Sequence, residues 1–199
     1  MKTMLAPGLS RTTGPTVEPI TLAEAKDHCE IASSEKAHDA KLARIIRAAR
    51  EQVENDTWQS LITQTFTMTF DEFPVDGLIK IPMKPIQSVT SITYYDSDNS
   101  QQTLSSSIYG LTAAKELIYR EYNESWPSHV IKPDGIEITF VAGYGDTAGS
   151  VPNVFKQAML LQISKWFEHR GDEMAVHGSG TYDQAYDRLI RRYMRATYP

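Results

Sequence analysis

The sequence lacks several features that would point to particular protein classes. Cys29 is its single cysteine, which excludes an intrachain disulfide and a zinc site built from several thiolates. Its apolar runs, such as residues 158–161, are far shorter than the roughly 20 residues that span a bilayer. The first residues have no apolar core of the kind a signal peptide needs, so no export signal is expected.

A basic excess is also missing. The chain carries 20 Lys and Arg against 25 Asp and Glu, a formal net charge of −5, which argues against wrapping nucleic acid over the whole surface. The charge is uneven, because residues 151–199 have a net charge of +2 and residues 1–150 one of −7. From Arg188 onward there are four arginines and no acid, so this end is a candidate for binding an acidic partner.

The composition that is present belongs to a globular protein. Hydrophobic residues make up 41% and charged residues 23% of 199 residues, which excludes a disordered, collagen-like or coiled-coil chain. A chain of this length buries a core without disulfides or metals. Residues 1–19 contain three prolines and two glycines without an apolar period, and they predict an extended arm.

Helical patterns enclose a β-rich middle. Thr21 and Glu24 have the spacing of a capping box, which predicts a short helix to about Glu30. Apolar residues at helical spacing predict further helices over residues 37–58 and 151–170, and a last one after the loop 171–180. Between them Phe66, Met68 and Phe70 alternate with threonine, as in a strand. Further strands are predicted at residues 78–81, 89–95, 101–104, 117–119 and 135–141.

The expected fold class is therefore α+β. A helical base of about four helices, residues 20–62 and 150–199, is interrupted by an inserted β domain, residues 63–149. The inserted strands are expected to form an antiparallel meander or a small barrel, because they are short and separated by turn residues. An extended N-terminal arm and a C-terminal tail helix complete the architecture.

Two groups of residues have the side chains of a nucleotide-binding loop or a metal site, but the surrounding sequence does not support either function. Residues 143–148 match the glycine pattern of dinucleotide-binding loops, but no helix begins directly after them and no βαβ unit surrounds them. A turn that needs glycine at positive φ is the favoured interpretation. His169, Asp172, Glu173 and His177 have metal-binding side chains, yet nothing fixes their geometry. We therefore expect no catalytic residue, no cofactor and no metal.

The arginine-rich end is the strongest binding candidate. Arginine pairs in a planar, bidentate manner with carboxylates or phosphates, and tyrosine adds amphipathic contact area. Docking on an acidic protein, contact with nucleic acid and an ordinary amphipathic terminal helix remain open. The residues expected to contact a partner are Tyr186, Arg188, Arg191, Arg192, Tyr193, Arg195 and Tyr198.

Several segments, taken in order and spacing, resemble one phage family. They are residues 19–26, 47–54, 61–65, 85–94, 140–146, 151–152, 156–158 and 166–170. Together they resemble the head-tail connector proteins, also called adaptor or head completion proteins, of tailed phages and related gene transfer agents. The resemblance is to the branch that carries a β insertion, and it extends over about residues 19–171.

The resemblance implies a structural virion protein of the neck, made in the host cytoplasm. It implies a ring, usually of twelve neighbouring copies, beneath the portal protein. The ring extends the channel through which DNA passes without sequence-specific binding. The C-terminal segment is expected to dock on the portal, and a tail-side connector or tail terminator protein binds elsewhere; no membrane is involved. The acidic excess of residues 1–150 is expected to line part of the channel.

Two alternatives to a non-enzymatic connector are kept. One is a nucleotide- or cofactor-binding enzyme that uses the Gly143–Ala148 turn. The other is a nucleic-acid-binding module that acts through the arginine-rich tail.

Overall fold

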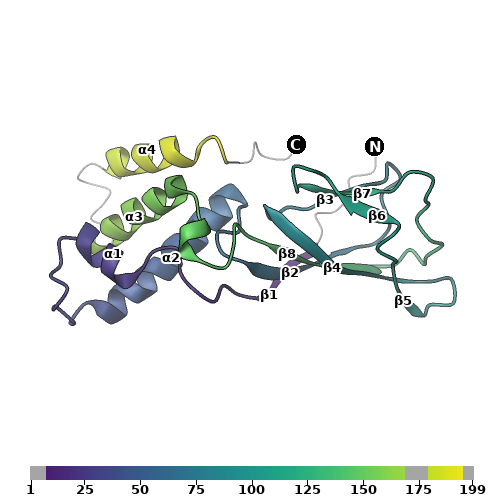
Figure 1. Cartoon of the computed structure of the whole chain (residues 1–199), viewed down its shortest axis with the longest axis horizontal. Coiled ribbons are helices and arrows are strands. Elements are labelled where there is room, and N and C mark those ends of the chain that lie inside the picture. The colour runs from purple at the N-terminus through teal and green to yellow at the C-terminus, as the bar shows by residue number, and fades with distance from the viewer. Residues whose placement is uncertain (1–7, 169–178, 195–199) are drawn as a thin grey trace. The chain divides into compact units, whose positions relative to one another are not determined.

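The computed structural model describes residues 8–168 and 179–194, and in these ranges the chain divides into two compact units (Figure 1). In the described chain, a β unit is made by residues 8–14 and 63–143, and a helical unit by residues 15–62, 144–168 and 179–194. The α+β class predicted from the sequence is confirmed. Across the described ranges, the structure has no helix that is both long and apolar enough to cross a bilayer.

The helical unit is built on four α-helices in the described residues. They are α1 (Leu22–His28), α2 (Asp39–Thr57), α3 (Asn153–Glu168) and α4 (Ser179–Ile190), with a short 3-10 turn η1 (Ala148–Ser150) before α3. The capping box predicted for α1 is present: the Thr21 hydroxyl accepts from the Glu24 amide, and the Glu24 carboxylate accepts from the Thr21 amide. In Figure 1, α3 lies between α2 and α4 and packs against both.

The core of the helical unit is continuous from α1 to α4. Leu42 and Val53 of α2, Phe155 and Ile163 of α3, and Ile190 at the end of α4 are all fully buried within it. Because the apolar residues of α2 recur at helical spacing, one face meets α3 while Arg44 and Arg47 stay exposed on the other.

A buried ion cluster ties two irregular segments to α2. Arg50, only 3% exposed, donates to Glu54 at 2.7 Å and to Glu18 at 2.9 Å. The other oxygen of Glu54 accepts from the backbone amide of Leu61 at 3.0 Å. Burial alone would lower the pKa of Arg50, but the charges of Glu54 and Glu18 outweigh it and raise that pKa. The cluster therefore holds the segments before α1 and after α2 in place.

The β unit contains two antiparallel sheets. The first has the strand order β1-β2-β8-β4-β5, and the second the order β3-β7-β6. In the described residues the strands are β1 (Gly8–Thr13), β2 (Gln64–Phe70), β3 (Leu78–Lys80), β4 (Ile86–Tyr95), β5 (Gln101–Thr103), β6 (Tyr109–Leu111), β7 (Leu117–Arg120) and β8 (Ile136–Ala142). Both sheets contribute to one core, in which Phe66 stacks on Phe140 with ring centroids 5.6 Å apart.

Three details differ from the prediction, and the simplest is that β6 was not expected as a strand. Residues 8–13 were predicted as part of an extended arm, but they form β1, the edge strand that pairs with β2. The sequence hides this strand because its pairing depends on backbone bonds and hydroxyl contacts, such as Ser10 to Thr67 at 2.7 Å, rather than on apolar alternation. The larger sheet is also no simple meander, since β8 lies between β2 and β4.

Candidate protein-docking surface

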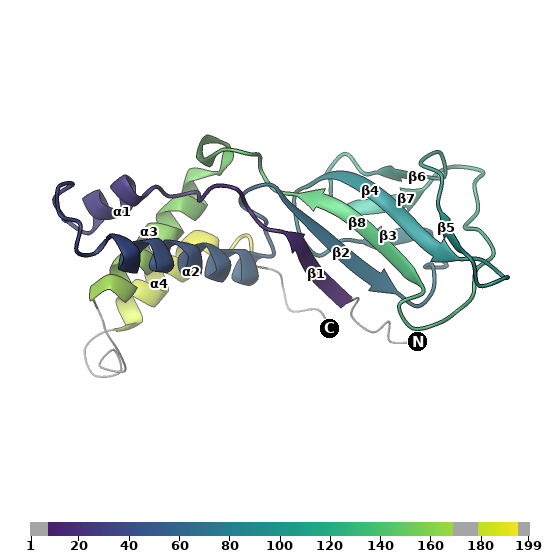
Figure 2. The same cartoon turned by 90° about the horizontal axis from the view of Figure 1, so that it is seen from below.

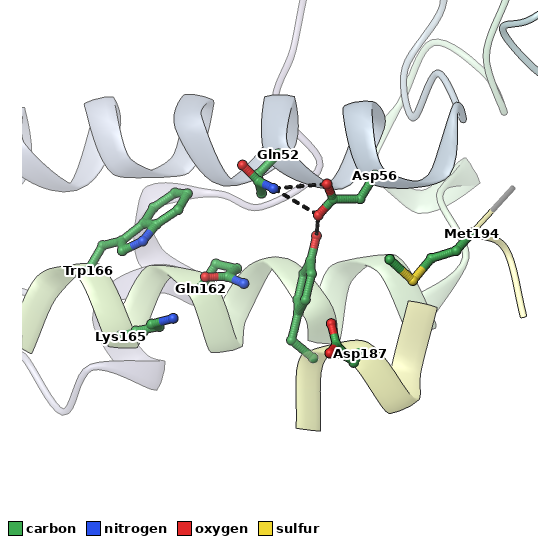
Figure 3. Close-up of a pocket in the computed structure, with 8 residues that line it drawn as sticks. Gln52, Asp56, Gln162, Lys165, Trp166, Asp187 and Met194 are labelled. Atoms are coloured by element: carbon green, nitrogen blue, oxygen red, sulfur yellow. Dashed lines mark hydrogen bonds between the residues drawn. The ribbon is translucent and has the colours of Figure 1, made fainter. Parts of the chain in front are cut away.

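The C-terminal helix α4 is attached to the helical unit by a buried tyrosine. Tyr186 is 5% exposed, and its hydroxyl donates to an oxygen of Asp56 in α2 at 2.7 Å. Both oxygens of Asp56 also accept from the side-chain amide of Gln52, one turn earlier in the same helix, at 2.8 and 2.9 Å (Figure 3). Tyr186 thus positions α4, and its side chain is covered in the described structure.

The surroundings of Tyr186 favour its neutral form. Burial first, and then the hydrogen bond to Asp56 and the charge of that carboxylate, raise the pKa of Tyr186 well above the ordinary tyrosine value. The hydroxyl therefore keeps its proton across the physiological range and remains a donor to Asp56.

Tyr193 follows α4 and packs on the same core. Its ring lies 4.8 Å from that of Phe155, which in turn lies 5.7 Å from Tyr144. Burial, with a smaller contribution from Tyr193, raises the pKa of Tyr144 to about 12. Tyr193 is half-buried, so it anchors the chain after α4 while leaving part of its ring accessible.

The arginines of this end point the other way. Arg188, Arg191 and Arg192 are exposed, and the Arg192 guanidinium lies 5.2 Å from the ring centroid of Tyr193. Met194, 41% exposed, follows them in the sequence. The structure therefore joins an inner anchor, Tyr186 with the buried Ile190, to an outer arginine surface that is made by the exposed side chains within residues 188–194. Arg195 and Tyr198, also predicted to contact a partner, lie outside the described residues.

A pocket of about 420 Å³ opens where α2, α3 and the end of α4 meet (Figure 3). Its lining residues are Gln52, Asp56, Gln162, Lys165, Trp166, Tyr186, Asp187 and Met194. Gln162 is 6% exposed, and within the described part of the chain its side-chain oxygen has no hydrogen-bond partner. The pocket was not predicted from the sequence. The one signal for it there is the i, i+4 spacing of Gln52 and Asp56, which lets two side chains of a helix form a hydrogen bond.

The sequence model of one protein family, described as phage gp6-like head-tail connector protein, matches residues 19–120, just over half of the chain. The matched stretch runs from the capping box of α1 to the end of β7. This chain belongs to the phage gp6-like head-tail connector family. The resemblance found in the sequence is thereby confirmed. Comparison with curated proteins gives no match.

Solved structures share the fold of this connector-family chain over nearly its whole length. A chain from the "Neck of empty GTA particle computed with C6 symmetry" superposes with a TM-score of 0.80 at 21% identity, covering 96% of this chain and 97% of the other. A chain from the "Virion of native gene transfer agent (GTA) particle" gives 0.76 at 23% identity with the same coverage. The "Neck of native GTA particle computed with C12 symmetry" gives 0.75 at 23% identity.

The glycine pattern of this connector-family chain forms a turn rather than a dinucleotide loop. Residues 143–148 follow β8, and they lead into the three-residue 3-10 turn η1, while α3 begins at Asn153, so the segment does not lead directly into an α-helix N-terminus. Within the described ranges β8 pairs antiparallel with both neighbours, whereas a dinucleotide fold needs parallel strands. Gly145 has φ of +154°, and a Cβ there would lie 2.6 Å from the Ser150 hydroxyl. Close packing explains this glycine.

The other candidate for chemistry cannot be placed. His169, Asp172, Glu173 and His177 all lie outside the described residues. Among residues 8–168 and 179–194, no group of three or more His, Cys, Asp or Glu is arranged to hold a metal ion.

Proposed function

We propose that this chain is a structural component of a virion neck, a head-tail connector that forms a ring of neighbouring copies beneath the portal protein. The observation that carries this proposal is the family match over residues 19–120, together with a fold shared with neck chains over 96% of its length. The C6 and C12 symmetries of those necks support a ring. The role is mechanical: the ring extends the DNA channel, and no catalysis is involved.

Within this role, the arginine surface, residues 188–194, docks on the portal. Three exposed arginines suit bidentate pairing with carboxylates, and a partially exposed tyrosine and methionine supply apolar contact beside them. Because Tyr186 and Tyr193 hold the helix from inside, the arginines are presented on a fixed support, which lowers the entropy lost on binding. Arg195 and Tyr198 extend the same surface in the sequence.

The test is a binding measurement between this chain and its portal, with two charge reversals of equal size. Arg191→Glu/Arg192→Glu should weaken portal binding at least tenfold, about 1.4 kcal/mol. It should lower the melting temperature only slightly, because both side chains are exposed and the contact of Arg192 with the Tyr193 ring is the one lost. Arg44→Glu/Arg47→Glu, on the exposed face of α2, is the matched control and should leave binding near the wild-type value. Mass photometry of the mixture with portal gives both occupancy and ring mass. Wild-type decoration of portals by the first variant would contradict the assignment of the arginines.

A further inference from the structure

The loops at one end of the β unit are separated from the places where the chain enters and leaves that unit. The chain passes between the units beside the end of β1, the start of β2 and the end of β8. The antiparallel register puts the ends of β2 and β4 beside the start of β8, at the opposite end of the sheet. In Figure 2 the arrowheads of β2 and β4 point to that end, and that of β8 points away from it. Three loops meet there, residues 71–77, 96–100 and 121–135, and we call them the tip.

The tip carries the most exposed large apolar side chains of the described chain. Val75 is 96% exposed, Tyr122 is 90% exposed and Ile131 is 67% exposed. Leu78, at the start of β3 beside the tip, is 41% exposed. Such side chains cost free energy in water, and three of them lie on loops that contact one another, with charged residues around them, as at sites of protein contact. Tyrosine is among the residues that dominate binding energy at interfaces.

Contacts between the loops of the tip hold them in one conformation, so the surface is formed without a partner. Phe73, 5% exposed, stacks on Trp126 with centroids 4.8 Å apart and meets His129 edge-on. The indole of Trp126 donates to the carbonyl of Pro74 at 3.1 Å. These contacts join residues 71–77 to residues 121–135.

The third loop is joined to the same framework. The amide of Val130 donates to the carbonyl of Tyr95 at 2.9 Å, and the ammonium of Lys132 donates to the side chain of Asn99 at 3.0 Å. The three loops therefore form one preorganised surface, which reduces the ordering cost of a contact.

The charge around these apolar side chains is strongly negative. The tip holds one lysine, Lys132, and eight acidic residues. The acids are Asp71, Glu72, Asp76, Asp96, Asp98, Glu121, Glu124 and Asp134. A surface of this kind repels DNA and favours a basic protein surface that has an apolar recess.

We propose that the tip is the docking surface for the neck protein on the tail side of the ring, and that this protein meets it with basic residues around an apolar recess. The inference rests on the proposed function. The portal surface that the arginines of residues 188–194 select is acidic and would repel the tip. A neighbouring copy in a ring presents the same acidic loops at the same level, so tip-to-tip contact is disfavoured as well. The two surfaces of opposite sign thus select different partners.

The test uses virus particles assembled with variant chains. Val75→Ser/Tyr122→Ser removes the apolar contacts, and Asp98→Lys/Glu124→Lys changes the tip charge by four; all four positions are exposed, so the fold should be retained. Val17→Ser, a 42% exposed valine of the helical unit, is the matched apolar control, and Glu30→Lys/Glu35→Lys the matched charge control. Purified particles are scored by electron microscopy for attached tails and by mass spectrometry for this chain.

Both tip variants are expected to give heads that contain this chain at the wild-type level and to reduce tail attachment at least tenfold, while both controls attach tails normally. Tails attached at the wild-type frequency by both tip variants would overturn the inference. Heads that have lost a folded tip variant would overturn it as well, because the tip would then serve the ring or the portal. If the wild-type chain itself were absent from the necks, the proposed function would fail instead, so the two failures are distinguishable.

Discussion

Replacing Tyr186 by phenylalanine tests whether α4 is held by the buried hydrogen bond to Asp56. The change removes only the hydroxyl, and the ring still fills its place between α2 and α4. A hydrogen bond to a charged group contributes about 1.5–3 kcal/mol. Because Asp56 keeps both contacts from Gln52, the lower end applies, and we expect a loss of about 1.5 kcal/mol in the free energy of unfolding near pH 8.

The loss should depend on pH in a direction fixed by the pKa of Tyr186. That pKa is raised in the folded state, so the contribution of the hydroxyl is complete below the unfolded value of about 10 and disappears as the pH rises above it. At pH 11 ionisation of this tyrosine stabilises the unfolded chain by about 1.4 kcal/mol. This offsets the hydrogen bond, so wild type and Tyr186→Phe should have nearly equal stability there.

The assay is urea unfolding of both proteins at pH 8 and pH 11, followed by circular dichroism. Other tyrosines, Tyr144 included, ionise in both proteins and cancel in the difference. Tyr122→Phe is the matched control, because Tyr122 is 90% exposed and its loss should change stability at neither pH. A gap between wild type and Tyr186→Phe that is the same at both pH values, or no gap at pH 8, would refute the assignment of the hydrogen bond.

Two further predictions concern the helical unit. Arg50→Met should lower the free energy of unfolding by about 3–5 kcal/mol, because it leaves the carboxylate of Glu54 buried without its cation. A loss under about 1 kcal/mol in urea unfolding would show that water reaches the cluster. Gly145→Ala should lower the free energy of unfolding by about 1–3 kcal/mol, because the φ of Gly145 is +154° and the new Cβ meets Ser150. Gly149→Ala is the control and should change the stability little, because the nearest atom to its new Cβ is 3.8 Å away. Equal effects of the two substitutions in urea unfolding would contradict the packing argument.

The sequence was informative wherever a local pattern determines the structure. The capping box of Thr21 and Glu24 located the start of α1, and the alternation of Phe66 and Met68 with threonine identified the buried face of β2. It failed for β1, whose residues pair through backbone and hydroxyl groups, and for β6, three half-buried residues with Gly110 at the centre. It also could not give the order of strands in a sheet, because β8 pairs with strands far away in the sequence.

For the candidate site, the sequence predicted which residues lie together on the last helix but not which of them are buried. The pattern placed tyrosines and arginines together on the last helix, but it could not tell a face that meets the core from one that meets a partner. Tyr186 lies inward because its hydroxyl bonds Asp56, 130 residues away in the sequence. The tip went unnoticed for the same reason: composition records Val75 and Tyr122 as apolar, and only the fold shows that they remain exposed.

The interleaving of the two units along the chain has a consequence for synthesis on the ribosome. The last strand of the β unit, β8, ends at Ala142, whereas Tyr186 and Ile190, which complete the core of the helical unit, are translated about 45–50 residues later. At about 5–20 residues per second this is an interval of about 2–10 seconds. During this interval α3 is made and packs on α2, but the face of α3 that meets α4 has no partner until α4 is complete. The helical unit, whose first helices are made before the β unit is finished, is therefore completed last, and newly made chains are most exposed to premature association through that face of α3.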